Sequence, residues 1–181
     1  MDGHALELES DTFDAAGSQF GVMLFPDMPK GLREMARVVK PGGSVLVHAY
    51  GDPHEIDFLK FLIRAVRSVR PGFDGPPNDP PPYESQLADR ERLRRELAAA
   101  GLADVSVETV TETTEFESGE ALWDWIVSSH PIVEAILESL RLTDADRDSV
   151  KRSLDLMVRE RAGAASSATL TNPVNIGIGR T

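Results

Sequence analysis

Residues 13–47 read FDAAGSQFGVMLFPDMPKGLREMARVVKPGGSVLV, and this stretch decides the fold. Apolar residues recur at helical spacing over residues 32–39, with basic residues on the opposite side. Asp27 can accept hydrogen bonds from the first free N–H groups of such a helix. Pro29 falls in its first turn, where a missing N–H costs little. The stretch predicts one strand–helix–strand crossover of an α/β sheet.

The second half of the stretch predicts a tight turn and a covered strand. The Pro-Gly-Gly sequence at residues 41–43 stops the helix. Residues 44–49 form a nearly unbroken apolar run, which is typical of a strand covered on both faces. The strand before the helix is harder to place, because residues 13–18 contain weak strand formers. Local propensity alone favours residues 21–25.

The helix, the KPGG turn and the strand together resemble a known family. They are similar to the second half of class I S-adenosylmethionine (SAM)-dependent methyltransferases, in the subgroup that includes ubiquinone- and menaquinone-biosynthesis enzymes. The sequence Asp2-Gly3-His4-Ala5-Leu6 is similar to that subgroup's D-[AG]-x-x-L element, and VNIGIGR at residues 174–180 resembles its closing strand. The resemblance places the earlier strand at residues 13–18.

The resemblance implies a partial Rossmann-like methyltransferase sheet, made of the family's strands four to seven with helices on both faces. The family's first three strands and its glycine-rich SAM loop are expected before Met1. The Gly177-Ile178-Gly179 sequence does not replace that loop, because a phosphate-cradling glycine loop leads into a helix, and here the chain ends two residues later. These glycines are expected to relieve crowding between strands.

The middle of the chain predicts two helices and a strand. Asp52 as cap and Pro53 at the first position predict a helix start, and a second helix is expected over residues 89–100. Between these helices, residues 71–83 contain six prolines and predict an extended loop or a mobile lid. Residues 105–109 alternate apolar and polar side chains, as a half-exposed strand near a sheet edge does.

The last third predicts helices followed by a strand. Residues 118–162 are helical, with an interruption at Pro131 and a capping box opening the last helix at Thr143. Residues 174–179 predict a final strand, which the resemblance inserts antiparallel into the sheet. We therefore expect a single, incomplete domain over residues 1–181, with 118–162 as a helical cap on the substrate side.

Composition limits the classes of partner and compartment. The net charge is −11, and residues 96–140 contain many acidic side chains but no Lys or Arg, so a nucleic-acid partner is not expected. A solvated acidic face is the simplest interpretation of this run. The chain has no cysteine, no apolar run of membrane-spanning length and no secretory pattern at its start. We expect a cytoplasmic protein with no membrane partner.

Candidate cofactor-binding residues follow from the resemblance. It implies that Asp2 and Gly3 lie at the adenine ring of SAM, and that Ser18, Gln19 and Phe20 face its methionine end. The alternative for Asp2 is a solvated terminal carboxylate. The loop after residues 13–18 lies at the carboxyl end of a strand, which is where open α/β sheets bind ligands.

Candidate acceptor-binding residues are aromatic. Tyr83 and Trp123 could line a pocket for a small-molecule acceptor, although core packing is the main alternative for Trp123. The four histidines show no metal-ligand spacing, and His48 is expected to pack within its strand. No metal site is predicted, and no catalytic residue is assigned.

The resulting hypothesis is SAM-dependent methyl transfer to a small organic molecule, carried out as part of a longer chain. The alternative is a non-catalytic α/β module, either truncated or paired with another chain. A sheet that lacks its first strands would expose the outer edge of residues 13–18. Self-association through this edge is therefore expected.

Overall fold

The computed structural model describes residues 1–75, 85–129 and 131–181, and these divide into two compact units. The first unit contains residues 1–53, 78–111 and 173–181, and the second contains residues 54–77 and 112–172. Each is described by itself. No helix in the described parts of the chain is long and apolar enough to cross a membrane.

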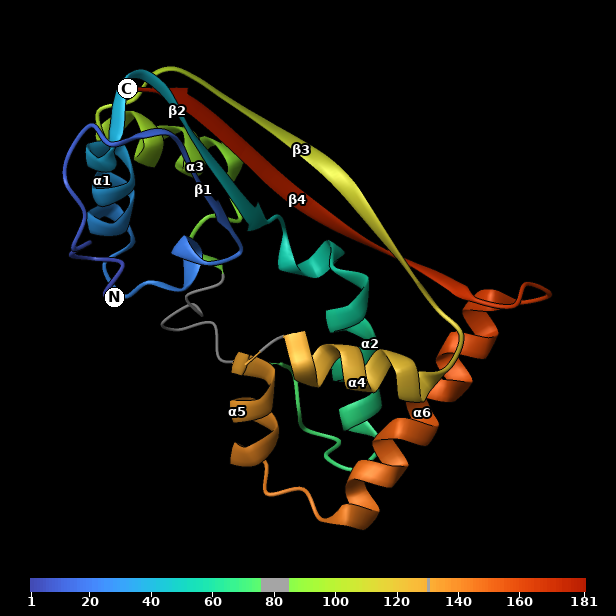
Figure 1. Cartoon of the computed structure of the whole chain (residues 1–181). Coiled ribbons are helices and arrows are strands. Elements are labelled where there is room, and N and C mark those ends of the chain that lie inside the picture. The colour runs from blue at the N-terminus through green and yellow to red at the C-terminus, as the bar shows by residue number, and fades with distance from the viewer. Residues whose placement is uncertain (76–84, 130) are drawn as a thin grey trace. The chain divides into compact units, whose positions relative to one another are not determined.

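The strands form one four-stranded mixed sheet in the order β1-β2-β4-β3, which confirms the predicted α/β fold (Figure 1). Strand β1 (Phe13–Gln19) runs parallel to β2 (Val39–Tyr50), and β2 runs antiparallel to β4 (Ala168–Arg180). Strand β3 (Ala103–Phe116) lies at the other edge of the sheet, beside β4. The closing strand is therefore inserted between its neighbours and antiparallel to β2, as expected.

The crossover between β1 and β2 follows the sequence closely. A 3-10 turn, Val22–Leu24, occupies the segment that local propensity favoured as a strand, so the earlier placement at β1 is confirmed. Helix α1 (Met28–Val38) begins where predicted, because the Asp27 side chain accepts from the Lys30 N–H at 3.1 Å. Gly42, with φ of +82°, lies in the irregular part of β2, where the register to β1 shifts.

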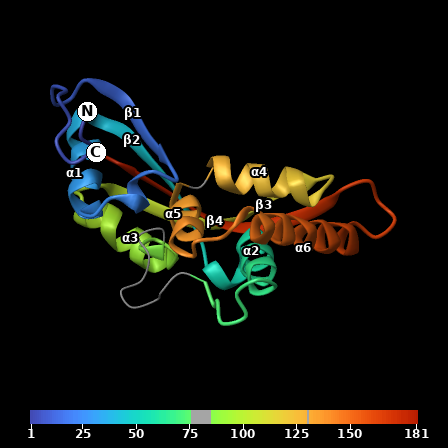
Figure 2. The ribbon, with the colours of Figure 1, turned by 90° about the horizontal axis from the view of Figure 1, so that it is seen from below.

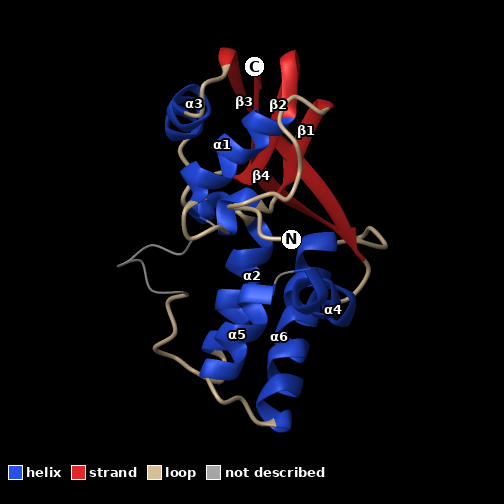
Figure 3. Cartoon of the chain, turned by 60° about the vertical axis from the view of Figure 1, so that its left-hand side comes forward, coloured by secondary structure: helices blue, strands red, loops and turns tan. Residues whose placement is uncertain are grey.

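The core of the first unit lies between the sheet and two helices. Helices α1 and α3 (Arg90–Ala99) lie on the same side of the strands (Figure 3). Side chains from α1, α3 and β2 form one buried cluster that includes Leu32, Leu93 and Val47. Gly177 of β4 faces α3, where an added Cβ would lie 2.6 Å from Leu97 Cδ1. Gly177 therefore makes room for α3, and Gly179 makes room for Leu102 and for Val105 of the neighbouring strand β3, so the expected crowding between strands holds at Gly179 and is corrected at Gly177.

Residues 44–49 are covered on one face, which corrects the expectation of two. Val45, Val47 and Ala49 are fully buried on the side of the helices. On the other face Leu46 remains 37% exposed, and its partner across the sheet, Ile178, remains 41% exposed. The alternation arises because successive side chains of a strand point to opposite faces, and α1 and α3 both lie against one of them.

Asn175 joins three segments of the first unit. Its side chain is 1% exposed, and its amide nitrogen donates to the carbonyl oxygens of Leu87 (3.0 Å) and Ala88 (2.8 Å). Its oxygen accepts from the Thr109 hydroxyl at 2.7 Å. A buried amide with all these bonds fixes β4 against β3 and against the segment that enters α3.

The second unit is built mainly from helices. These are α2 (Asp57–Arg67), α4 (Gly119–Ser129), α5 (Pro131–Ser139) and α6 (Asp144–Ala162), and α2 and α4 both pack on α6. The predicted capping box at Thr143 is confirmed, since Thr143 and Asp146 bond each other's backbone N–H groups. The helix predicted from Pro53 begins later: residues 53–55 form a short 3-10 turn, and α2 starts at Asp57.

Candidate functional site

The candidate site lies in the first unit, where β1 and β2 end beside the amino-terminal loop. Strands β1 and β2 run side by side and parallel, so their carboxyl ends meet at the same edge of the sheet (Figure 1; Figure 2). The last register pair is Gln19 with His48. The segments expected to contact SAM are the loop after β1 and residues 2–3, and both belong to this unit.

Asp2 is held by a local turn and by His4. One carboxylate oxygen, Oδ1, accepts from the His4 backbone N–H and from His4 Nδ1, both at 2.9 Å. The bond from the His4 N–H is the main reason that the pKa of Asp2 lies below its usual value. On the other side of the ring, His4 Nε2 accepts from the Asp27 N–H at 3.3 Å. His4 therefore links Asp2 to the first turn of α1.

Gly3 packs against the ring of Phe25. A Cβ added to Gly3 would lie 2.3 Å from the Phe25 ring, so no other residue fits without movement of that ring. The His4 ring also lies against Phe25, with a centroid distance of 4.8 Å. Residues 2–4 are thereby placed against the segment that connects β1 to α1. Gly3 and His4 therefore contact the connection between β1 and α1, which is the connection that begins at Phe20.

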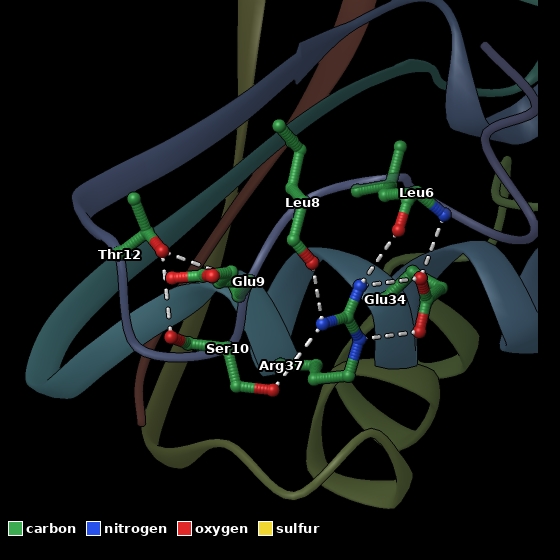
Figure 4. Close-up of polar contacts among 7 residues, drawn as sticks. All are labelled: Leu6, Leu8, Glu9, Ser10, Thr12, Glu34 and Arg37. Carbon is green, nitrogen blue, oxygen red and sulfur yellow. Dashed lines mark hydrogen bonds and ion pairs between the residues drawn. The ribbon is translucent and has the colours of Figure 1, made fainter.

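An ion pair on α1 fixes the rest of the amino-terminal loop (Figure 4). Arg37 donates to the carbonyl oxygens of Leu8 (2.9 Å) and Leu6 (3.1 Å), and its Nε lies 2.7 Å from Glu34 Oε1. Glu34 in turn accepts from the Leu6 N–H at 2.8 Å. The hydrogen bond from Arg37 outweighs partial burial and lowers the pKa of Glu34 to about 2. This pair is a feature that sequence reasoning missed, because its partners lie about 30 residues away.

Ser18 and Gln19 are the last residues of β1 and Phe20 follows them, whereas the loop was expected to include all three. The Ser18 hydroxyl accepts from the Val22 N–H at 2.8 Å, so this side chain shapes the loop. Gln19 is exposed. Phe20 has a positive φ of 54°, and its N–H donates to the His48 carbonyl oxygen at 3.0 Å. The loop therefore turns sharply away from the sheet at Phe20.

Two side chains of β2 that the sequence did not single out lie beside Phe20. The Phe20 ring stacks on Tyr50 with a centroid distance of 4.5 Å and meets His48 edge-on at 6.5 Å. His48 lies within its strand and is partly buried, as expected. It shares the face of β2 that carries Leu46. The signal that could have found it is its even spacing with Leu46 and Tyr50, opposite the buried residues 45, 47 and 49.

The predicted acceptor-binding residues, Tyr83 and Trp123, stay predictions. Trp123 belongs to the second unit, where it is 5% exposed and Lys151 Nζ lies 5.9 Å from its ring centroid. This environment supports the alternative of core packing. Tyr83 lies outside the described residues. Among the residues that the structure describes, no three His, Asp or Glu side chains gather as metal ligands would.

Comparison with known proteins finds similarity to methyltransferases. Residues 1–64 match the model of the ubiE/COQ5 methyltransferase family. A demethylmenaquinone methyltransferase of Corynebacterium kroppenstedtii is 37% identical over 120 residues, which are 61% of this chain and 51% of that protein. One of Bacillus cytotoxicus is 40% identical over 75 residues, 40% of this chain and 32% of that protein. The chain thus spans about half the length of the Corynebacterium relative.

Solved structures show weaker likeness. A putative methyltransferase of Bacillus halodurans is 13% identical, with a TM-score of 0.49 over 99% of this chain and 69% of that one. Phosphoethanolamine N-methyltransferase 2 of Haemonchus contortus is 17% identical, with a TM-score of 0.47 over 99% of this chain and 36% of that one. The sequence match is the stronger finding: residues 1–64 of this chain are similar to the ubiE/COQ5 methyltransferase family.

Proposed function

We propose that this chain supplies part of a site for methyl transfer from SAM to a small organic molecule. The observation that carries the proposal is the family match over residues 1–64, which contains all the residues expected to contact SAM: Asp2, Gly3, Ser18, Gln19 and Phe20. The matched relatives are named demethylmenaquinone methyltransferases. A ring compound of that kind is the acceptor class that they suggest.

The described residues fit the two ends of SAM that they are expected to hold. Asp2 has one carboxylate oxygen bonded to His4, while Oδ2 has no bond to any described residue, so it can accept from an exocyclic amine. Gly3 keeps the loop close to Phe25, and a side chain here would displace that ring. Phe20 is partly exposed where β1 ends. These groups support binding of the adenine and methionine ends.

Methyl transfer requires correct positioning of SAM and the acceptor more than it requires a reactive side chain. SAM supplies the activated methyl group when it is bound, and the transfer is an in-line displacement. The residues of this chain would hold the acceptor at the correct distance and exclude water. The clamp of Glu34 and Arg37 supports this role, because it fixes the loop that carries Asp2 to α1.

The second candidate is a non-catalytic half-domain that pairs with another chain. One observation favours it: β1 pairs with β2 alone among the described strands, so one edge of the sheet is open to another chain. A cap formed by residues 118–162, acceptor contacts by Tyr83 and Trp123, and a cytoplasmic location remain predictions.

A fusion distinguishes the two candidates. The part of the Corynebacterium kroppenstedtii relative that precedes the matched residues would be joined to this chain. Methyl transfer from radiolabelled SAM to demethylmenaquinol would then be measured. We expect transfer by the fusion and none by the 181-residue chain alone. A folded fusion that binds SAM but transfers no methyl group would favour the non-catalytic candidate.

A further inference from the structure

Phe20, His48 and Tyr50 form an aromatic shelf at the carboxyl ends of β1 and β2. The Phe20 and Tyr50 rings are nearly parallel, with an interplanar angle of 20°, and the His48 ring meets Phe20 at 73°. All three residues are partly exposed. Phe20 and Tyr50 pack against the buried core of the first unit, and the exposed part of the stack offers an apolar surface that a flat ring can contact.

The backbone of the shelf is held in an unusual conformation. Phe20 adopts a φ of 54°, which is uncommon for a residue with a large side chain. The hydrogen bond from its N–H to the His48 carbonyl oxygen and the stack on Tyr50 hold it there. Left-handed backbone at non-glycine residues is concentrated at ligand-binding loops, where the surrounding structure over-determines it. This conformation places the Phe20 ring beside His48.

His48 carries a polar atom that the protein leaves unpaired. Its Nδ1 is buried and has no hydrogen-bond partner, one of two such side-chain atoms among the described residues. A histidine that serves only to pack a strand normally has both ring nitrogens paired or solvated. A buried nitrogen without a partner is costly, so each case calls for a specific explanation. His48 lies near the end of β2, beside the predicted ligand site, and a ligand that displaces the atoms covering Nδ1 would supply the missing partner.

We propose that the aromatic shelf binds the methyl acceptor, and that His48 Nδ1 hydrogen bonds to a hydroxyl group on the acceptor's ring. Phe20 and Tyr50 supply the apolar surface for the ring. A hydroxyl group both donates and accepts, so it pairs with Nδ1 in either tautomer of the imidazole, which a carbonyl or an alkyl group does not do. This proposal rests on the proposed function, and it assigns the acceptor to the aromatic shelf rather than to Tyr83 or Trp123.

Two small probes test the shelf with the 181-residue chain itself. 2-Naphthol and naphthalene have the same fused rings and differ by one hydroxyl group. Titration followed by NMR should show 2-naphthol binding about five- to tenfold more tightly, the effect of one hydrogen bond to a buried group. In long-range proton–nitrogen spectra, 2-naphthol should shift the Nδ1 signal of His48, and naphthalene should not. This readout needs no variant.

Substitutions then assign the effect to named atoms. His48→Phe should bind both probes equally, whereas His48→Asn, which keeps a polar atom near the Nδ1 position, should retain the preference for 2-naphthol. Phe20→Ala should weaken both probes. His54→Asn changes an exposed histidine of the second unit and serves as the matched control.

Three results would overturn the proposal: a folded chain that binds neither probe, equal affinity for both in the unmodified chain, or an unchanged preference in His48→Phe. SAM takes no part in these titrations. A chain that shows the preference while its fusion fails to bind SAM would contradict the proposed function and leave the shelf intact. A fusion that binds SAM but shows no preference between the two probes would contradict the aromatic shelf and leave the proposed function intact.

Discussion

The carboxylate of Asp57 lies almost entirely inside the second unit, at 4% exposure, and has four hydrogen-bond donors around it. The N–H and hydroxyl of Thr171 each donate to Oδ2 at 3.0 Å, Arg161 donates to the same oxygen at 3.1 Å, and Lys60 lies 2.8 Å from Oδ1. Burial raises the pKa of Asp57, but the bonds from Lys60 and Thr171 outweigh it and lower the pKa to about 2. One side chain thereby ties α2 to α6 and β4.

The first prediction concerns the pH dependence of this site. The folded pKa of Asp57 lies below its unfolded value of 3.8, so the carboxylate stabilises the fold above about pH 4. That contribution, up to about 2 kcal/mol, should be lost as the pH falls towards 2. In Asp57→Asn the unfolding free energy should be lower at pH 7 and should fall less between pH 4 and 2.

Urea unfolding at several pH values measures this effect. Asp148→Asn, an exposed carboxylate on α6, is the matched control and should behave like the unmodified chain. Equal acid sensitivity in Asp57→Asn and the unmodified chain would show that Asp57 does not carry the effect.

Helix α4 approaches α6 so closely that its first residue must be glycine. A Cβ added to Gly119 would lie 2.1 Å from the backbone nitrogen of Asp155, and the Gly119 N–H donates to the Asp155 side chain at 3.2 Å. Backbone atoms cannot move aside as the end of a flexible side chain can. The spacing of these two helices is therefore set by the absence of a side chain at one position.

The second prediction is that Gly119→Ala destabilises the second unit by about 2–3 kcal/mol, because overpacking forces the helices apart. Gly72→Ala is the control, since no atom lies within 4 Å of the Cβ it would add. Thermal unfolding of the two variants makes the comparison. A Gly119→Ala variant as stable as Gly72→Ala would mean that α4 and α6 are not packed as described.

The third prediction concerns the loop that α1 holds through Arg37. Arg37→Ala removes the donors to the Leu6 and Leu8 carbonyl oxygens, so amide hydrogen exchange in residues 6–12 should become about tenfold faster. Arg33→Ala, an exposed arginine of the same helix, should leave exchange unchanged. Hydrogen exchange is measured by mass spectrometry. Equal exchange rates of residues 6–12 in the two variants would show that Arg37 does not hold this loop.

At the scale of elements, sequence reasoning succeeded where the causes are local. Asp27 and Thr143 cap their helices as predicted, because the bonds involved span three residues. Asp52 failed as a predictor of a helix start. Helix α2 begins at Asp57, whose partners Thr171 and Arg161 lie more than 100 residues away. The same holds for the candidate site. Phe20 was predicted from the local sequence, but its contacts with His48 and Tyr50 arise only because β1 pairs with β2.

At the scale of the whole molecule, the sheet has one open edge and one partly open face in the first unit. Strand β1 pairs with β2 alone among the described strands, and its residue Phe13 is 38% exposed. Leu46 and Ile178 are exposed on the uncovered face. Unpaired backbone groups at an edge are a template for another strand, and exposed apolar side chains reduce the stability that burial would give.

The fourth prediction is that the 181-residue chain self-associates through β1 and is marginally stable. Ala15→Lys places a charge on this edge and should shift the chain towards monomer in sedimentation velocity at micromolar concentration. Glu7→Lys, which adds a similar charge outside the strand, should not. A monodisperse monomer with a high, cooperative melting transition would contradict both parts of the prediction.

The central claim is that residues 1–20 of this chain hold SAM when the rest of the fold is supplied. Titration calorimetry of SAM into the fusion with the Corynebacterium kroppenstedtii segment tests it most directly, with Asp2→Ala as the variant and Glu7→Ala as the control. We predict binding by the fusion, weak or no binding by the 181-residue chain, and a loss of about 1–3 kcal/mol in Asp2→Ala but not in Glu7→Ala. Micromolar binding of SAM by the 181-residue chain alone, or an unchanged dissociation constant in Asp2→Ala, would contradict the account.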